Sequence, residues 1–285
     1  MTGYIDVGGG MRAVYGAGVL DCCLDDGLEF PYYIGVSAGS ANIISYLGGH
    51  KERTLRFYRD YSSRREYMSF YNLVRNKSYI GLDYIYTTLT SEGGEDPLDF
   101  EKMKSHNCDF YIVSTDAVTG KTRYFDYRNM QKNDYFELKA SCCIPVVCPA
   151  YEKDGIFFYD GGVSDPIPVR KALNNGCDKI IVTLSLPADY RKPHKVPKNI
   201  YRMVMKKYPE TAHLMYSMID KYNESLDYIS ELEKQGKVLV LSPDDCCGVS
   251  TLKHPRDGIE ELYRKGYNDA KKIRSFLLCG EDAHE

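Results

Sequence analysis

Two short strand candidates, each followed at once by glycines and then by a helical pattern, stand within the first fifty residues. The first runs over residues 3–7, reaches a run of three glycines at 8–10, and continues into helical spacing over 11–24. The second runs over 32–36 and, after a small-residue turn, leads into a helix at 42–47. Two consecutive strand–turn–helix units predict an α/β fold with a largely parallel sheet covered by helices.

Further strand candidates are apolar runs bounded by turn residues at 110–115, 122–127, 156–159 and 180–184, so that with the first two we expect a sheet of about six strands. Another strand candidate lies near the end, at 238–242. The polar, Tyr- and Arg-rich stretch 51–89 predicts a helical insertion. Beyond Pro187, helical patterns at 201–234 and 257–278 flank the last strand. We therefore predict one domain over 1–285, with a core at 3–186 and a helical tail at 199–285 that rejoins the sheet.

Composition narrows the classes of function. Of the 285 residues, 43% are hydrophobic and 27% are charged, which is typical of a globular chain with a sizeable core. Lys and Arg number 37 against 40 Asp and Glu, so no basic excess predicts nucleic-acid binding. No apolar run reaches about 18 residues, which argues against a membrane span. The ten cysteines include no CxxC pair and indicate reduced thiols. We expect no secretory signal and a cytoplasmic location.

Ser37 stands in a GxSxG pattern between a predicted strand and a predicted helix. Gly35, Ala38 and Gly39 are its small neighbours. This context is typical of a nucleophile elbow, in which a sharp turn lifts the serine hydroxyl out of the backbone. The helix that follows favours the negative charge that develops on such a nucleophile. Small-residue turns of this kind also occur without catalytic function, so the pattern needs partners elsewhere.

The glycine run of Gly8, Gly9 and Gly10 with Arg12 closes the first strand and opens a helix. Unpaired backbone amides at such a turn form an anion site. The run fits neither a GxxxxGK[ST] phosphate loop nor a GxGxxG dinucleotide fingerprint. A plain tight turn is the simpler reading, but an oxyanion hole is the use that also explains Ser37.

Asp160, Gly161 and Gly162 close a later strand. A carboxylate at the carboxyl end of a parallel strand can point into the same crevice as Ser37. Asp-Gly is also a common turn dipeptide, so this motif gains meaning only together with the other two.

Together these residues resemble the patatin-like phospholipase family, which includes the catalytic domain of cytosolic phospholipase. The similarity lies in GGGMR at 8–12, GVSAG at 35–39, and the segments 140–145 and 159–169 around the aspartate. It covers roughly residues 3–186. The resemblance implies a three-layer α/β/α fold and a bacterial-type serine acyl hydrolase of the phospholipase or lysophospholipase kind.

The resemblance also implies a catalytic dyad in place of a triad. Ser37 would be the nucleophile and Asp160 the general base, with the amides of Gly9 and Gly10 as oxyanion hole and Gly8 shaping the turn. The acyl group would pass through an acyl-enzyme, and neither a metal nor a cofactor is required.

Three further positions follow from the same comparison. Arg12 matches an arginine that, in the cytosolic phospholipase branch, is associated with the substrate phosphate. Ala13 stands where many members have glycine, and Asp165 where many have asparagine. The second of these departures would affect only the local hydrogen bonding beside Asp160.

Two other classes of function stay open at this stage. One is an α/β-hydrolase with a histidine, since Ser37, Asp160 and His254 follow the order of that fold. Only one strand precedes Ser37, which disfavours it. The other is a catalytically silent lipid-binding protein of the same fold.

Two basic stretches are candidate contact sites for a binding partner. Residues 51–77 carry eight basic and three acidic side chains. The other stretch has basic residues without acidic ones among them: Arg191, Lys192, Lys195, Lys198, Arg202, Lys206 and Lys207. One hypothesis is peripheral contact with an anionic membrane surface that presents the lipid or other ester substrate; the alternative is a solvated helix face. The sequence does not determine the oligomeric state.

Overall fold

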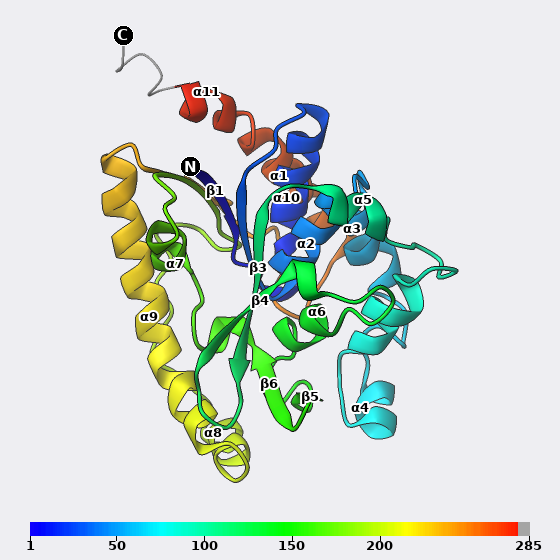
Figure 1. Ribbon diagram of the computed structural model, residues 1–285. Helices are drawn as coiled ribbons and strands as arrows, with labels where there is room; N and C mark the ends of the chain where they lie inside the picture. Colours follow the sequence, from blue (N-terminus) through cyan, green and yellow to red (C-terminus); the bar gives the residue numbers. More distant parts are fainter. Residues whose placement is uncertain (279–285) are drawn as a thin grey trace.

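The two strand–turn–helix units form the middle of an eight-stranded sheet (Figure 1). The computed structural model describes residues 1–278. The strands are β1 (Thr2–Asp6), β2 (Tyr32–Val36), β3 (Asp109–Asp116), β4 (Thr122–Asp126), β5 (Tyr151–Lys153), β6 (Ile156–Asp160), β7 (Lys179–Thr183) and β8 (Val238–Leu241). They are ordered β5-β6-β3-β2-β1-β7-β8, and β4 also pairs with β3.

The five central strands β3, β2, β1, β7 and β8 are parallel, as predicted. The expected number of about six strands is too low. The strand β5, which has three residues and only partial burial, is too short to give a periodic pattern. β6 is antiparallel to both β3 and β5, so Asp160 does not end a parallel strand as expected.

Helices cover both faces of the sheet and make three layers (Figure 1). On one side lie α1 (Val14–Asp25), α2 (Ala38–Leu47) and α10 (Arg256–Asp269), and on the other α7 (Val169–Asn174) and α9 (Pro209–Lys234). Because side chains alternate along a strand, Tyr4 and Tyr33 enter the core on the first side and Ile5 and Ile34 the core on the second.

The two long helical patterns of the tail each contain a break. The predicted helix 201–234 is two helices, α8 (Lys198–Met205) and α9, and Pro209 begins the second because proline is tolerated only in a first turn. The predicted helix 257–278 is α10 and α11 (Lys272–Leu278). β8 lies between these pairs and joins the sheet beside β7. The predicted tail to 285 extends past the described residues.

The segment 51–89 consists of short helical pieces that pack over the end of α2. They are α3 (Arg53–Arg56), η2 (Phe57–Tyr61), α4 (Phe70–Asn76) and η3 (Tyr84–Leu89). The buried Asp96 carboxylate ties the first piece down, because it forms ion pairs with Arg53 at 3.4 Å and with Arg56 at 2.8 Å. This insertion therefore forms a second wall beside α2.

The remaining helical elements are short: η1 (Gly10–Ala13), α5 (Phe100–Ser105), η4 (Tyr127–Asn129), α6 (Phe136–Ser141) and η5 (Gly161–Val163). Of residues 1–278, no helix combines the length and the hydropathy that a bilayer crossing requires.

Candidate active site

Ser37 lies between β2 and α2 in a strained backbone conformation, with φ 55° and ψ −133°. The neighbouring glycines make this turn possible. A Cβ at Gly35 would lie 2.4 Å from Ser40 Cα, and one at Gly39 would lie 2.3 Å from the Asp6 carbonyl oxygen. The amide of Ser37 donates to Ser141 Oγ at 2.9 Å. The GxSxG segment therefore has the geometry of a nucleophile elbow.

Asp160 reaches Ser37 through the register of β3. Val36 pairs with Val113 on one strand, and Asp160 pairs with the next residue of β3, Ser114. The carboxyl ends of β2 and β6 therefore meet end to end. The antiparallel direction of β6 brings the aspartate to the elbow, by a route that differs from the one the sequence predicted.

The backbone around Asp160 is fixed on both sides. Its amide donates to the Cys143 carbonyl at 2.8 Å, and its Oδ1 accepts from the Gly162 amide at 2.8 Å. A Cβ at Gly161 would lie 2.3 Å from the Val113 carbonyl oxygen, so this position requires glycine for close packing. The DGG segment is thus a turn that also orients a carboxylate.

Burial raises the pKa of Asp160 to about 6. Hydrogen bonding from the Ser37 hydroxyl and the Gly162 amide, and the positive charge of Lys192, act in the opposite direction. Burial destabilises the charged form of a carboxyl group and so makes it a better proton acceptor near neutral pH. The pair has the electrostatics that general-base chemistry needs.

The glycine loop packs directly on the elbow. Gly8, Gly9 and Gly10 have φ values of 68°, 122° and 63°, which L-residues with side chains rarely adopt. A Cβ at Gly8 would lie 2.2 Å from the Val36 carbonyl oxygen. In the described part of the chain, the amides of Gly9 and Gly10 donate no hydrogen bond, whereas the Gly8 amide donates to Asp6. Two amides without an acceptor therefore lie beside Ser37 and are available to an anion.

Asp6 is a functional candidate that the sequence did not reveal. Its buried carboxylate accepts from the Gly8 amide at 2.9 Å and from Asn42 Nδ2 at 2.8 Å. Burial raises its pKa to about 6, although both hydrogen bonds act in the opposite direction. The sequence feature that could have identified Asp6 is the presence of an acidic residue within an otherwise apolar strand. Asp6 links the glycine loop to α2, which carries Asn42.

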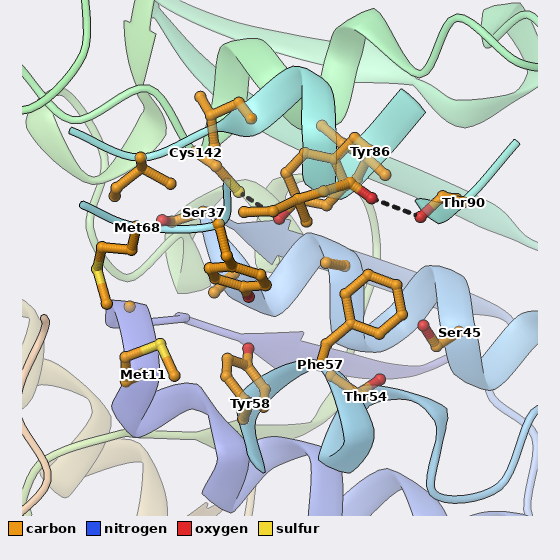
Figure 2. A pocket seen from close by; sticks show the side chains of 18 of the residues that line it. Met11, Ser37, Ser45, Thr54, Phe57, Tyr58, Met68, Tyr86, Thr90 and Cys142 are labelled. Carbon is orange, nitrogen blue, oxygen red and sulfur yellow. Dashed lines mark hydrogen bonds between the residues drawn. The ribbon is translucent and has the colours of Figure 1, made fainter. Parts of the chain in front are cut away.

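The first of two hollows that meet at Ser37 is a narrow, largely apolar cavity of about 70 Å³, which we call the enclosed cavity because it is the less open of the two. On the side of α2 it is lined by Ala38, Ala41, Ile44 and Ser45. Rings from the insertion, among them those of Phe57 and Tyr58, form the facing wall, with Ser37 and Ser45 at opposite ends (Figure 2). The cavity is therefore a narrow slot along the helix.

Hydroxyls and a guanidinium close the far end of this cavity. Arg53 donates to Ser45 Oγ at 2.9 Å and to Thr90 Oγ1 at 3.0 Å, and it also forms the ion pair with Asp96. Burial lowers the pKa of Arg53 to about 10, so the group stays charged at neutral pH. This wall is polar and internally hydrogen-bonded.

The second hollow is more open, with a volume of about 280 Å³, and it contains both Ser37 and Asp160. Arg12 and Lys192 line it. The Nε of Arg12 is buried and has no hydrogen-bond partner among the described residues. Lys192 Nζ lies 3.9 Å from the centre of the Tyr222 ring. Two cations therefore face the side of Ser37 opposite the apolar cavity.

His254 lies outside both hollows, and its Nδ1 contacts the Leu252 carbonyl at 3.3 Å. Asp165 accepts a hydrogen bond from the Tyr124 hydroxyl, so the departure from asparagine is accommodated beside the site. The described cysteines are all free. Residues 1–278 contain no group of three or more His, Cys, Asp or Glu side chains placed to hold a metal ion.

Comparisons with known proteins agree with the motifs. The family model described as patatin-like phospholipase matches residues 7–173, and one described as a domain of unknown function (DUF6363) matches residues 208–275. The uncharacterized protein YjjU of Escherichia coli (strain K12) is 27% identical over 186 residues, which are 64% of this chain and 51% of that protein. The chain thus spans about half the length of this curated relative.

A solved structure was also found. The crystal structure of VipD from Legionella pneumophila aligns with a TM-score of 0.49 and 13% sequence identity. The alignment covers 96% of this chain and 66% of the other.

Proposed function

The chain belongs to the patatin-like phospholipase family, and from that premise we propose that it is a serine acyl hydrolase that cleaves carboxylic esters of lipids with a Ser37/Asp160 dyad. The observation that carries the proposal is the buried carboxyl of Asp160 beside Ser37: burial raises its pKa to about 6, and its interaction with the Ser37 hydroxyl acts in the opposite direction. An activated serine at an elbow is the requirement for acyl-enzyme chemistry.

In the proposed cycle Asp160 accepts the proton of the Ser37 hydroxyl while Oγ attacks the ester carbonyl carbon. The tetrahedral intermediate collapses, the bond to the alcohol oxygen breaks, and Asp160 returns the proton to that leaving oxygen. Water then gives a proton to Asp160 and attacks the acyl carbon. The bond between the acyl carbon and Ser37 Oγ breaks, Asp160 returns the proton to Oγ, and the carboxylic acid leaves.

The negative charge of the intermediate would rest on the amides of Gly9 and Gly10, which have no other acceptor in the described residues. Ser37 also precedes the first turn of α2, and the partial positive charge of a helix N-terminus favours charge there. Removal of one oxyanion donor typically costs on the order of a hundredfold or more in rate.

We place the acyl chain in the enclosed cavity. The nucleophile Ser37 and the polar wall at Ser45 are eight residues apart along α2, which is about 12 Å at 1.5 Å per residue. With carbon–carbon bonds of about 1.5 Å, that length sets an upper limit of roughly eight to ten extended carbons. A volume of about 70 Å³ holds only a few methylene groups, so a chain of that length requires the ring wall of the insertion to move outward. The charged and hydroxyl groups that close the cavity would stop a longer chain.

We place the alcohol part of the ester in the open hollow. Arg12 and Lys192 provide positive charge there, and the buried Nε of Arg12 is a donor without a partner in the described part. Guanidinium and ammonium groups in such a place favour a phosphate. A phospholipid or lysophospholipid is thus the substrate class that this arrangement fits best.

Labelling with a fluorophosphonate tests the proposal. We expect mass spectrometry to find the probe on Ser37 of the wild-type chain, no labelling of Ser37→Ala, and much slower labelling of Asp160→Asn. His254→Ala serves as the control and should label at the wild-type rate. A folded wild-type chain that neither labels nor hydrolyses esters would instead indicate a silent lipid-binding protein, and loss of labelling in His254→Ala would indicate a triad.

A further inference from the structure

The helix α4 exposes large apolar side chains to solvent. Phe70 is 75% exposed and Val74 is 86% exposed, while Tyr71 and Leu73 are each about two-fifths exposed. Only Asn72 of this helix is buried. Figure 1 places α4 at an outer edge of the molecule, away from the central sheet. Four neighbouring apolar residues on one short exposed helix form a patch of the kind that marks an interaction site.

Positive charge flanks this patch. No acidic residue occurs between positions 67 and 82, and Arg75 and Lys77 form no ion pair within the described residues. Arg75 donates to the hydroxyl of Tyr71 at 2.6 Å, and Arg65 lies over the Tyr71 ring while pairing with Glu66. Apolar side chains beside unpaired cations are the composition that an anionic lipid surface attracts.

The patch is connected to the enclosed cavity. The residues that flank α4, Met68 and Ile80, form an isolated bridge with each other, and both line the cavity. The amide of Ser69 donates to the Tyr79 carbonyl at 3.0 Å and closes the base of this helical loop. Figure 2 shows Met68 on the Ser37 side of the cavity. The exposed helix thus stands over the end of the cavity where the ester would react.

We infer that α4 is a docking surface for an anionic lipid membrane, with Phe70, Leu73 and Val74 entering the interface and Arg75 and Lys77 contacting headgroups. The inference rests on the proposed function for its choice of a lipid over a protein partner. It assigns the membrane contact to the first of the two basic stretches. The second stretch has more cations outside ion pairs, but on α8 Met203 is the one large apolar side chain that is exposed, against four on α4.

Vesicle sedimentation tests the surface directly. The wild-type chain is mixed with vesicles of phosphatidylcholine alone and with vesicles of equal parts phosphatidylcholine and phosphatidylserine. We expect binding to the mixed vesicles, and a loss of roughly tenfold or more in Phe70→Ser/Val74→Ser because two apolar side chains no longer leave water. Arg75→Gln/Lys77→Gln should lose about fivefold per cation, and only on the anionic vesicles.

Matched controls use exposed apolar residues elsewhere. Val118 and Met203 are each 57% exposed, and Val118→Ser should bind vesicles as the wild type does. Binding that survives Phe70→Ser/Val74→Ser, or that is lost in Met203→Ser on α8 instead, overturns the inference. No binding by the wild type overturns it as well.

Hydrolysis of water-soluble p-nitrophenyl butyrate separates this inference from the proposed function. Phe70→Ser/Val74→Ser should retain wild-type turnover of this ester, because neither residue lines a hollow that contains Ser37. An inactive wild type that still binds vesicles through α4 would refute the hydrolase and retain the docking surface. An active wild type that does not bind vesicles would refute the docking surface and retain the hydrolase.

Discussion

The two hollows that meet at Ser37 differ in shape, charge and origin. The enclosed cavity is narrow and apolar, while the open hollow is four times larger in volume and carries two cations. With the exception of Thr251, the enclosed cavity is lined from within residues 7–173, the part matched by the family model. The open hollow also takes Ser185, Leu186, Lys192, Met215, Met218, Tyr222 and Thr251 from beyond it.

This difference separates two kinds of specificity. The enclosed cavity, which we propose as the acyl side, is built by the same segment that carries the three motifs, and its length depends on α2 and the insertion. The open hollow, which we propose as the alcohol side, is completed by α9 and the segment before α8, which the motifs do not describe. Changes in the C-terminal part of the chain should therefore alter the alcohol preference and leave the acyl preference in place.

The largest effect is expected in the glycine loop beside Ser37, at Gly9, which lines the open hollow. Its φ of 122° suits only glycine, and a Cβ would lie 2.1 Å from Ser185 Oγ. Gly9→Ala should displace an oxyanion amide and lower kcat for every ester by about a hundredfold or more. Steady-state kinetics on one short and one long ester checks this.

Gly27→Ala is the matched control, because Gly27 also has a positive φ but has open space where its Cβ would stand. It should lose some stability and keep full activity. If Gly9→Ala hydrolyses both esters at the wild-type rate, the glycine loop is a structural turn and not an oxyanion hole.

The sequence predicted the parts of the site that depend on local backbone geometry. The elbow at Ser37 and the glycine loop have positive φ values, which only a few residue types permit, so the sequence marks both. Asp160 was predicted from its turn, and the structure places it beside Ser37, although its strand runs in the opposite direction to the one expected. Local turn chemistry does not specify strand direction, because direction depends on pairing with a distant strand.

The sequence did not predict which distant residues contact the site. Ser141, within the segment 140–145, accepts from the Ser37 amide 104 positions away, and Lys192, within the second basic stretch, lines the open hollow. No local pattern predicts either contact, because each depends on the tertiary fold. The shape of the enclosed cavity could not be predicted either. One of its walls comes from the insertion, whose helical periodicity is broken by short π-helical pieces such as η2 and η3.

A smaller effect, confined to the acyl side, is expected from Ala41→Phe. Ala41 lies one turn along α2 from Ser37 and lines only the enclosed cavity of these two hollows. A phenyl ring there should block the slot while leaving the nucleophile free. We expect kcat/KM for an octanoyl ester to fall about tenfold or more relative to that for an acetyl ester.

Met218→Phe fills the opposite hollow and is the control for chain length, since Met218 lines only the open side. It should leave the ratio of octanoyl to acetyl hydrolysis as in the wild type. If Met218→Phe changes this ratio and Ala41→Phe does not, the acyl chain occupies the open hollow and the assignment of the two sides is reversed.

The smallest effect concerns charge in the open hollow and is read from pH profiles. The proposed mechanism requires ionised Asp160, so activity should rise as the pH increases through about 6. Burial and the nearby Arg12 charge lower the pKa of Lys192 to about 8. A phosphate-bearing ester should therefore bind less well as the pH rises through about 8 and Lys192 loses its charge, whereas an uncharged ester should show no such decline.

The variant Lys192→Met separates the rise in activity near pH 6 from the decline in phosphate-ester binding near pH 8. The variant should lose the decline near pH 8 with the phosphate-bearing ester, because no titrating ammonium remains. It should also shift the rise toward higher pH with both esters, because the positive charge that lowers the pKa of Asp160 is gone. Arg12 remains in the variant and keeps part of the attraction for phosphate. If the rise in activity near pH 6 stays at its wild-type position, Lys192 lies too far from Asp160 to influence the dyad. If the decline near pH 8 is unchanged, Lys192 takes no part in phosphate binding.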